Sequence, residues 1–109
     1  SSAASDVYKR QALIVPHFGI MEDWCKSENI HWTSGEFMIH NIKVIDKFQS
    51  EINILNGELP NFKQIKGFVL CPKEWTAEEG EITHTLKPVR TVLEKKYANE
   101  IEKIYGKPI

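Results

Sequence analysis

The sequence predicts a small α+β domain, with a three-stranded sheet or hairpin packed against three to four helices. One observation is that apolar residues recur every three or four positions in residues 42–55 and again in residues 89–105. A second is that two short apolar stretches, "ALIVP" and "GFVLCP", end in proline and are too short for helices. The 109 residues suffice for one domain, and contents of 41% hydrophobic and 27% charged residues are ordinary for a globular chain.

The first part of the chain predicts one strand and two helical segments. Residues 8–16 contain the apolar run "ALIV" and form the strand, which Pro16 ends. Apolar residues at helical spacing begin after Phe18, and Asn29 closes that helix. After a loop, Ser34 is a candidate cap for a short helical turn.

The clearest amphipathic helix follows. Asn41 is its predicted N-cap, and Asn56 with Gly57 stops it. Charged and polar residues occupy its opposite face. Its apolar face is formed by Ile42, Ile45, Phe48, Ile52 and Leu55.

Two further strands and a long helix complete the predicted domain. Residues 65–73 form a strand whose apolar centre indicates that it is covered. A tight turn follows, in which Thr76 and Glu79 have the spacing of a capping box. Residues 81–85, "EITHT", form a third, short strand. Pro88 lies near the first position of the last helix, which continues to the end of the apolar stripe and is stopped by Gly106 and Pro108.

Composition excludes several classes of protein. A net charge of −1 gives no broad basic field, so we expect no nucleic-acid partner. The longest apolar runs have five residues or fewer, so we expect neither a transmembrane segment nor a signal peptide, and a cytoplasmic location. We expect residues 1–6 to be a disordered lead-in or an expression remnant, residues 7–106 to be the domain, and residues 107–109 to be a tail.

The cysteines and histidines predict no metal site. Cys25 and Cys71 lie far apart among apolar residues, which favours two buried free thiols over a disulfide or a metal or redox role. No CxxC or CxxH spacing exists, and the histidines show neither HxxH nor HExxH spacing. Unpaired thiols fit a reducing compartment.

Sequence motifs for self-contained catalysis are also missing. There is no GxGxxG, no GxxxxGK[ST] and no GxSxG. One basic residue nevertheless has a constrained place, because Lys87 follows the predicted strand and directly precedes Pro88 in "EGEITHTLKPVR". The residues alone favour a solvated surface charge at this position.

The stretch "GEITHTLKPVR" resembles the end of AMP-forming acyl-CoA synthetases, most of all the long-chain fatty acid branch. Similarity extends over residues 62–105 and over the upstream piece "QALIVPHF". The family has a turn glycine, a strand of the form LTxTxK and a basic helix start. The matching positions are Gly80, Ile82, Thr83, Thr85, Lys87 and Arg90. His84 stands where proline is frequent in similar proteins. Leu86 stands where the wider superfamily often has glycine, and it matches the long-chain branch.

The resemblance implies a fragment, the mobile C-terminal domain of a long-chain fatty acid–CoA ligase. Lys87 would be the catalytic adenylation lysine, and Thr85 and Arg90 would contact substrate. The chain's own N-terminal adenylation domain would be its partner. ATP, Mg²⁺ and coenzyme A would serve the full-length enzyme, which could be peripheral to a membrane. We expect no cofactor in the fragment, which should be inactive alone.

Two alternatives remain open at this point. One is another adenylate-forming carboxylic acid ligase, and the other is a non-catalytic binding or interaction module of the same fold. A phosphate loop upstream in the parent reading frame would favour a ligase, because phosphate binding requires it.

Overall fold

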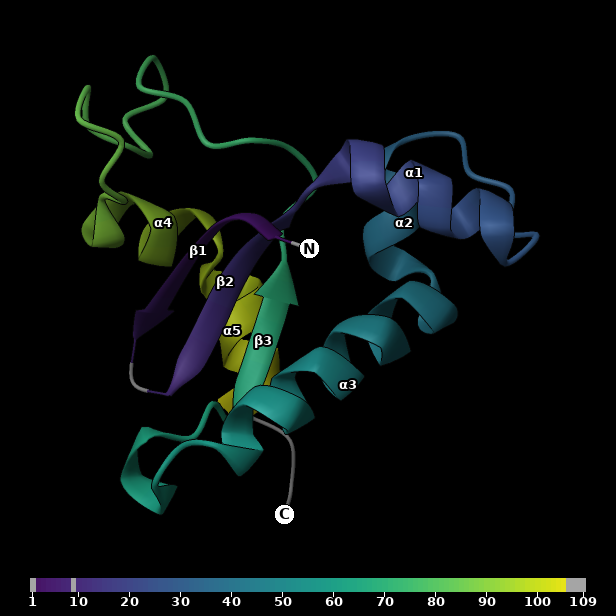
Figure 1. Ribbon diagram of the computed structural model, residues 1–109. Helices are drawn as coiled ribbons and strands as arrows, with labels where there is room; N and C mark the ends of the chain where they lie inside the picture. The colour runs from purple at the N-terminus through teal and green to yellow at the C-terminus, as the bar shows by residue number, and fades with distance from the viewer. Residues whose placement is uncertain (1, 9, 106–109) are drawn as a thin grey trace.

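The computed structural model describes the backbone of residues 2–8 and 10–105 (Figure 1). Within them lie five α-helices and a three-stranded sheet, which confirms the predicted small α+β class. The elements in chain order are β1 (Ser2–Tyr8), β2 (Gln11–Pro16), α1 (Phe18–Ser27), α2 (Gly35–His40), α3 (Ile42–Gly57), the 3-10 helix η1 (Asn61–Lys63), β3 (Gly67–Leu70), α4 (Arg90–Lys96) and α5 (Ala98–Tyr105).

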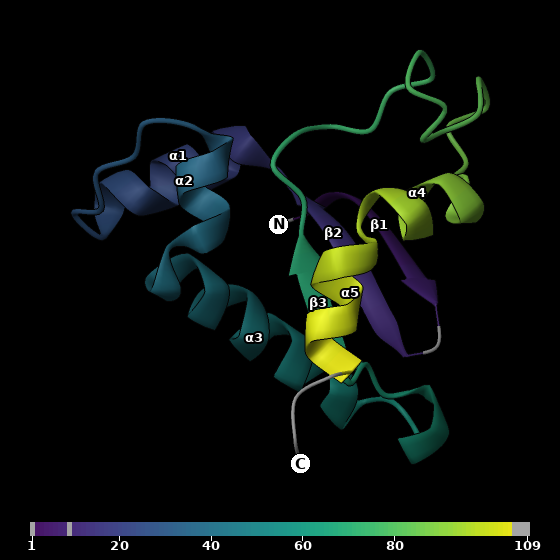
Figure 2. The same cartoon turned by 180° about the vertical axis from the view of Figure 1, so that it is seen from behind.

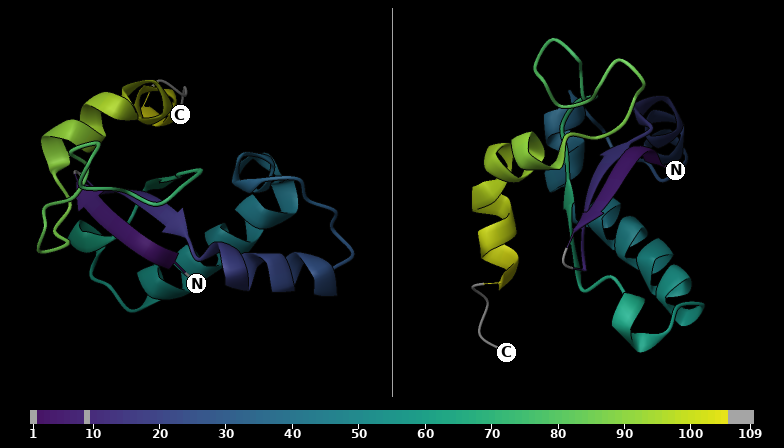
Figure 3. Two further views of the ribbon diagram at one scale, coloured as in Figure 1. Left: turned by 90° about the horizontal axis from the view of Figure 1, so that it is seen from above. Right: turned by 90° about the vertical axis from the view of Figure 1, so that its left-hand side faces the viewer.

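The central strand, β2, is buried along its whole length because helices cover both faces of the sheet (Figure 3). The strand order is β1-β2-β3, with β1 antiparallel and β3 parallel to β2. Since side chains alternate along a strand, Ala12 and Ile14 belong to one core cluster while Leu13 and Val15 belong to the other. The first cluster joins the sheet to α1, α2 and α3, and the second joins it to α4 and the loop before it.

We expected residues 1–6 to be a disordered lead-in or an expression remnant, and the described part of this segment is a strand. Ser2 to Asp6 form part of β1 instead of a disordered lead-in, and Ser5 and Asp6 pair with Ile14 and Leu13 of β2. The composition of this segment, rich in Ser and Ala, does not predict a strand. The segment forms one because β2 supplies partners for its backbone hydrogen bonds. The tail predicted at residues 107–109 lies outside the described residues.

Helix α3 confirms the helix predicted from periodicity, but only part of its predicted apolar face: Phe48 and Ile52 are buried together with Val44, whereas Ile42 and Leu55 are exposed. The side chain of Asn41 accepts hydrogen bonds from the N–H groups of Lys43 and Val44, so it is the N-cap. The helix continues to Gly57. The predicted end of α1 at Asn29 is also confirmed. Asn29 follows the helix with φ 57°, a left-handed conformation that asparagine tolerates.

The prediction of a third strand at residues 81–85 is wrong. Residues 81–85 contribute only one bridging pair, between Ile82 and Pro88. The chain turns back at residues 84–86 and α4 begins at Arg90, so this pairing has no room to extend into a strand of the sheet. The third strand of the sheet is β1 instead.

The prediction of a single last helix is also wrong. The chain divides into α4 and α5 at Tyr97, whose φ of −106° and ψ of 20° are not helical. Tyr97 and Leu93 are both buried against the sheet, and the bend lets both helices lie on that face (Figure 2). Pro88 precedes the N-cap Val89, so it is not the first residue of the helix.

The prediction of two buried free thiols agrees with the structure. Cys25 and Cys71 are free and fully buried. No helix among the described residues combines the length and apolar character that crossing a bilayer requires.

Candidate functional site

The loop between β3 and α4 projects past the end of the sheet and carries the candidate residues (the green-to-lime segment of Figure 1). Trp75, with 5% of its surface exposed, anchors its first part in the core beside Leu93. A turn follows, in which the Thr76 hydroxyl accepts a hydrogen bond from the Glu79 N–H at 3.3 Å. The return carboxylate expected from Glu79 comes instead from Glu81, which accepts from the Thr76 N–H at 3.2 Å. Thr76 therefore caps a turn and not a helix.

Residues 81–89 form a short hairpin that stands on this turn. The Val89 N–H donates to the Glu81 carbonyl at 2.8 Å, and the Thr83 N–H donates to the Lys87 carbonyl at 2.9 Å. At the tip, the Leu86 N–H donates to the Thr83 carbonyl at 2.9 Å. Leu86 itself has φ 64°. This is the pattern of a three-residue hairpin loop that ends in a left-handed residue.

Leu86 occupies the position that such loops usually give to glycine. The left-handed conformation brings a Cβ too close to the following carbonyl and costs about 1–2 kcal/mol for a residue other than glycine. The departure noted in the sequence, leucine in place of a frequent glycine, therefore falls on a residue with strained backbone.

Lys87 lies on the returning arm of the hairpin, exposed to solvent. Thr83 holds its backbone from both sides, because the Thr83 N–H donates to the Lys87 carbonyl and the Thr83 hydroxyl accepts from the Lys87 N–H at 3.2 Å. Within the part of the chain that the structure describes, the Lys87 ammonium makes no hydrogen bond or ion pair. The hairpin therefore presents a cation on a fixed backbone.

The two proposed substrate contacts differ in their surroundings. Thr85 is on the same hairpin, exposed, and its hydroxyl lies 3.0 Å from the hydroxyl of Thr83. Arg90 opens α4, where its guanidinium reaches the Asp6 carboxylate at 3.6 Å and the Val7 carbonyl at 3.4 Å. The structure thus brings Thr85 and Lys87 together and places Arg90 against β1.

An ion pair whose carboxylate partner Glu81 is buried joins the base of the hairpin to α4. The Lys96 ammonium lies 3.0 Å from the carboxylate of Glu81, a side chain only 3% exposed, and 2.7 Å from that of Glu79. Hydrogen bonds to these two carboxylates raise the pKa of Lys96, and the bond from Lys96 lowers the pKa of Glu79. No pattern in the sequence pointed to Glu81 and Lys96 as partners. Their separation of 15 positions gives no local signal.

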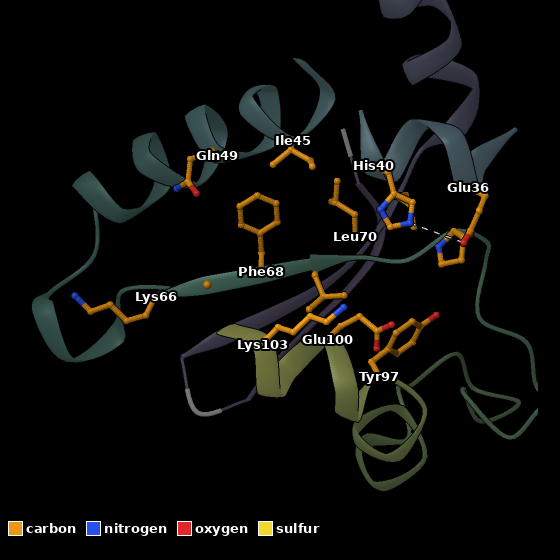
Figure 4. A pocket seen from close by; sticks show the side chains of 14 residues that line it. Glu36, His40, Ile45, Gln49, Lys66, Phe68, Leu70, Tyr97, Glu100 and Lys103 are labelled. Carbon is orange, nitrogen blue, oxygen red and sulfur yellow. Dashed lines mark ion pairs between the residues drawn. The ribbon is translucent and has the colours of Figure 1, made fainter. Parts of the chain in front are cut away.

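The largest groove among those described does not contain these residues. It has a volume of about 660 Å³ and lies along the open edge of β3, between α3 and α5 (Figure 4). Ile45 and Phe68 line one side, and Tyr97 and Glu100 the other. Across the described residues, no group of three or more His, Cys, Asp or Glu side chains could hold a metal ion.

Comparison with known proteins gives a consistent set of relatives. The chain is 31% identical over 64 residues to "Long-chain-fatty-acid--CoA ligase FadD15" of Mycobacterium tuberculosis, covering 59% of this chain and 11% of that protein. It is 24% identical over 97 residues to "Long chain acyl-CoA synthetase 8" of Arabidopsis thaliana, covering 87% and 14%. "Long-chain-fatty-acid--CoA ligase 5" of Mus musculus is 29% identical over 87 residues, covering 80% and 11%.

The chain is related to the acyl-CoA synthetases. No protein-family model matches it, and no solved structure does. The chain spans between 11% and 14% of the length of these acyl-CoA synthetase relatives. The remaining length of such a ligase is far larger than the domain described above.

Proposed function

We propose that this chain is the C-terminal domain of an AMP-forming long-chain fatty acid–CoA ligase and that Lys87 supplies the cation for carboxylate activation. The observation that carries the proposal is the hairpin, which holds the Lys87 backbone through Thr83 and leaves the side chain exposed. The relatives named as long-chain fatty acid–CoA ligases support the reaction class.

The first half-reaction explains why a lysine is needed. A carboxylate oxygen of the fatty acid attacks the α-phosphorus of ATP, the bond to the leaving pyrophosphate breaks, and an acyl-adenylate forms. Two anions must approach each other in this step. A positioned ammonium group offsets their repulsion and stabilises the charge that grows in the transition state. Lysine suits the task because its charge is compact and its stem is long.

The rest of the machinery belongs to the parent enzyme. The phosphate loop, the ATP and Mg²⁺ site and the acyl tunnel would lie in the N-terminal adenylation domain. After adenylation this small domain would rotate, withdraw Lys87 and present another face to coenzyme A for thioester formation. A hairpin that projects past the sheet can be inserted and withdrawn as one rigid piece (Figure 2).

The test uses Lys87→Ala in the full-length parent enzyme and measures the two half-reactions separately. Acyl-adenylate formation from fatty acid and ATP should fall by on the order of 10²–10³ or more, the typical loss for one preorganised donor. Thioester formation from preformed acyl-adenylate and coenzyme A should persist. The matched control is Lys95→Ala, which removes an exposed lysine from α4 and should leave both steps unchanged.

Two results would contradict the proposal. Undiminished adenylation by Lys87→Ala would remove this residue from the chemistry. Equal loss in both half-reactions would instead assign it a structural role. An upstream phosphate loop in the parent reading frame would separate the ligase from a non-catalytic module of the same fold.

A further inference from the structure

Leu86 combines two unfavourable features in one residue. It adopts a left-handed backbone conformation, with φ 64°, and it exposes 76% of its surface. Several other large apolar side chains are comparably exposed, such as Phe62 at 72% and Ile54 at 71%, but neither has a positive φ. The described residues with a positive φ other than glycine are Arg10, Asn29 and Leu86.

The isolated domain gains nothing visible from a leucine at this position. The side chain belongs to neither core cluster, and the hairpin hydrogen bonds around it use backbone groups and the Thr83 hydroxyl. A glycine would make the same turn without strain. Strained backbone and an exposed apolar side chain together indicate an interaction that forms only when another surface is present.

We propose that Leu86 is a docking residue, whose side chain enters an apolar recess of the parent enzyme's adenylation domain and so places Lys87 for the first half-reaction. This inference rests on the proposed function. Leu86 is the direct neighbour of Lys87 at the tip of the same hairpin, so a surface that receives this tip lies within reach of both side chains. The relatives are long enough to provide that surface, since the chain spans only 11% to 14% of their length.

A docking role and a structural role predict different effects on the stability of the domain and on the activity of the enzyme. If Leu86 served the fold of the domain, its replacement would lower stability and activity together. If it serves docking, Leu86→Gly and Leu86→Asn relieve the strained backbone and leave the 109-residue chain as stable or more stable. The same variants lose the apolar surface that enters the recess, so adenylation by the full-length enzyme falls.

The experiment measures both quantities in one set of variants. In the 109-residue chain, the urea midpoints of Leu86→Gly and Leu86→Asn should equal or exceed that of the original sequence. In the full-length enzyme, their adenylation rate at saturating ATP and fatty acid should fall about tenfold or more, the equivalent of leaving a buried leucine without its contacts. Thioester formation from preformed acyl-adenylate should be spared. Leu86→Met keeps an apolar side chain of similar volume and should retain most of the adenylation rate.

Each failure has a distinct meaning when Lys87→Ala is measured beside these variants. If Lys87→Ala abolishes adenylation while Leu86→Gly and Leu86→Asn leave it unchanged, docking through Leu86 is wrong and the proposed function stands. If the variants lower the midpoint together with the rate, Leu86 has a structural role and the inference is overturned. If Lys87→Ala itself has no effect, both proposals fall.

Discussion

The carboxylate of Glu81 lies 3.0 Å from the ammonium group of Lys96, so the base of the hairpin and helix α4 are joined by an ion pair that is buried on one side. The Glu81 side chain is 3% exposed and also accepts a hydrogen bond from the Thr76 N–H. Its own N–H donates to the Thr76 carbonyl, and its carbonyl accepts from Val89. Glu81 therefore connects the turn, the hairpin and α4.

Removal of the cation from this pair should destabilise the domain. Lys96→Met leaves the buried Glu81 carboxylate without its charged partner, and we expect a loss of about 1–3 kcal/mol in the free energy of unfolding. The control is Lys95→Met on the same helix, because Lys95 is exposed and makes no ion pair with a described residue. Urea unfolding of the 109-residue chain provides the measurement. Identical midpoints for the two variants would show that the pair contributes nothing to stability.

Two glycines in helices should respond in opposite ways to the same substitution. A Cβ at Gly35 would lie 2.5 Å from the carbonyl oxygen of Pro72 and 3.0 Å from the ring of Phe18, so Gly35→Ala must displace backbone. At Gly57, by contrast, a Cβ meets nothing within 4 Å. We expect Gly35→Ala to cost about 1–3 kcal/mol through overpacking, and Gly57→Ala to be neutral or to stabilise by up to about 1 kcal/mol. Thermal unfolding of both variants tests this, and an unaffected Gly35→Ala variant would contradict the tight contact between α2 and the loop after β3.

Stability should decline at alkaline pH. Burial raises the pKa of Cys25 and Cys71 above their ordinary 9.0, and burial raises the pKa of the Tyr97 phenol above 10.0. Above the unfolded-state values the native chain therefore holds more protons than the unfolded chain. The stability that these neutral groups contribute is complete below about pH 9 and is lost as the pH rises through the native pKa values. Each such group then lowers the free energy of unfolding by up to about 1.4 kcal/mol per pH unit.

The measurement is a series of urea midpoints from about pH 7 to about pH 11. Tyr97→Phe removes one of the groups while it retains the ring, and the decline above pH 10 should become shallower. A midpoint that stays constant across the range, or rises with pH, would contradict the buried neutral state of these groups.

Local patterns in the sequence determined the helices of the first half of the domain. The apolar period of residues 42–55 and the cap at Asn41 specify α3 without reference to any partner, because capping and amphipathicity act within a few residues. The two covered strands were placed for a similar reason, since a short apolar run bounded by proline has few other interpretations. The resemblance carried by "GEITHTLKPVR" agrees with relatives that share the long-chain ligase names.

Only the tertiary structure decided how the second half is arranged. A strand forms only where it finds a pairing partner. Residues 81–85 pair only with the few residues between the tip of the hairpin and α4, so they form one arm of a short hairpin, while Ser2–Tyr8 forms a strand by pairing with β2. The stripe of the last helix is continuous in sequence, yet burial of Leu93 and Tyr97 against the sheet divides it into α4 and α5. Glu81 and Lys96 support the hairpin through a contact between distant positions, and the strain of Leu86 lies in its backbone dihedral angle. Local periodicity encodes neither feature.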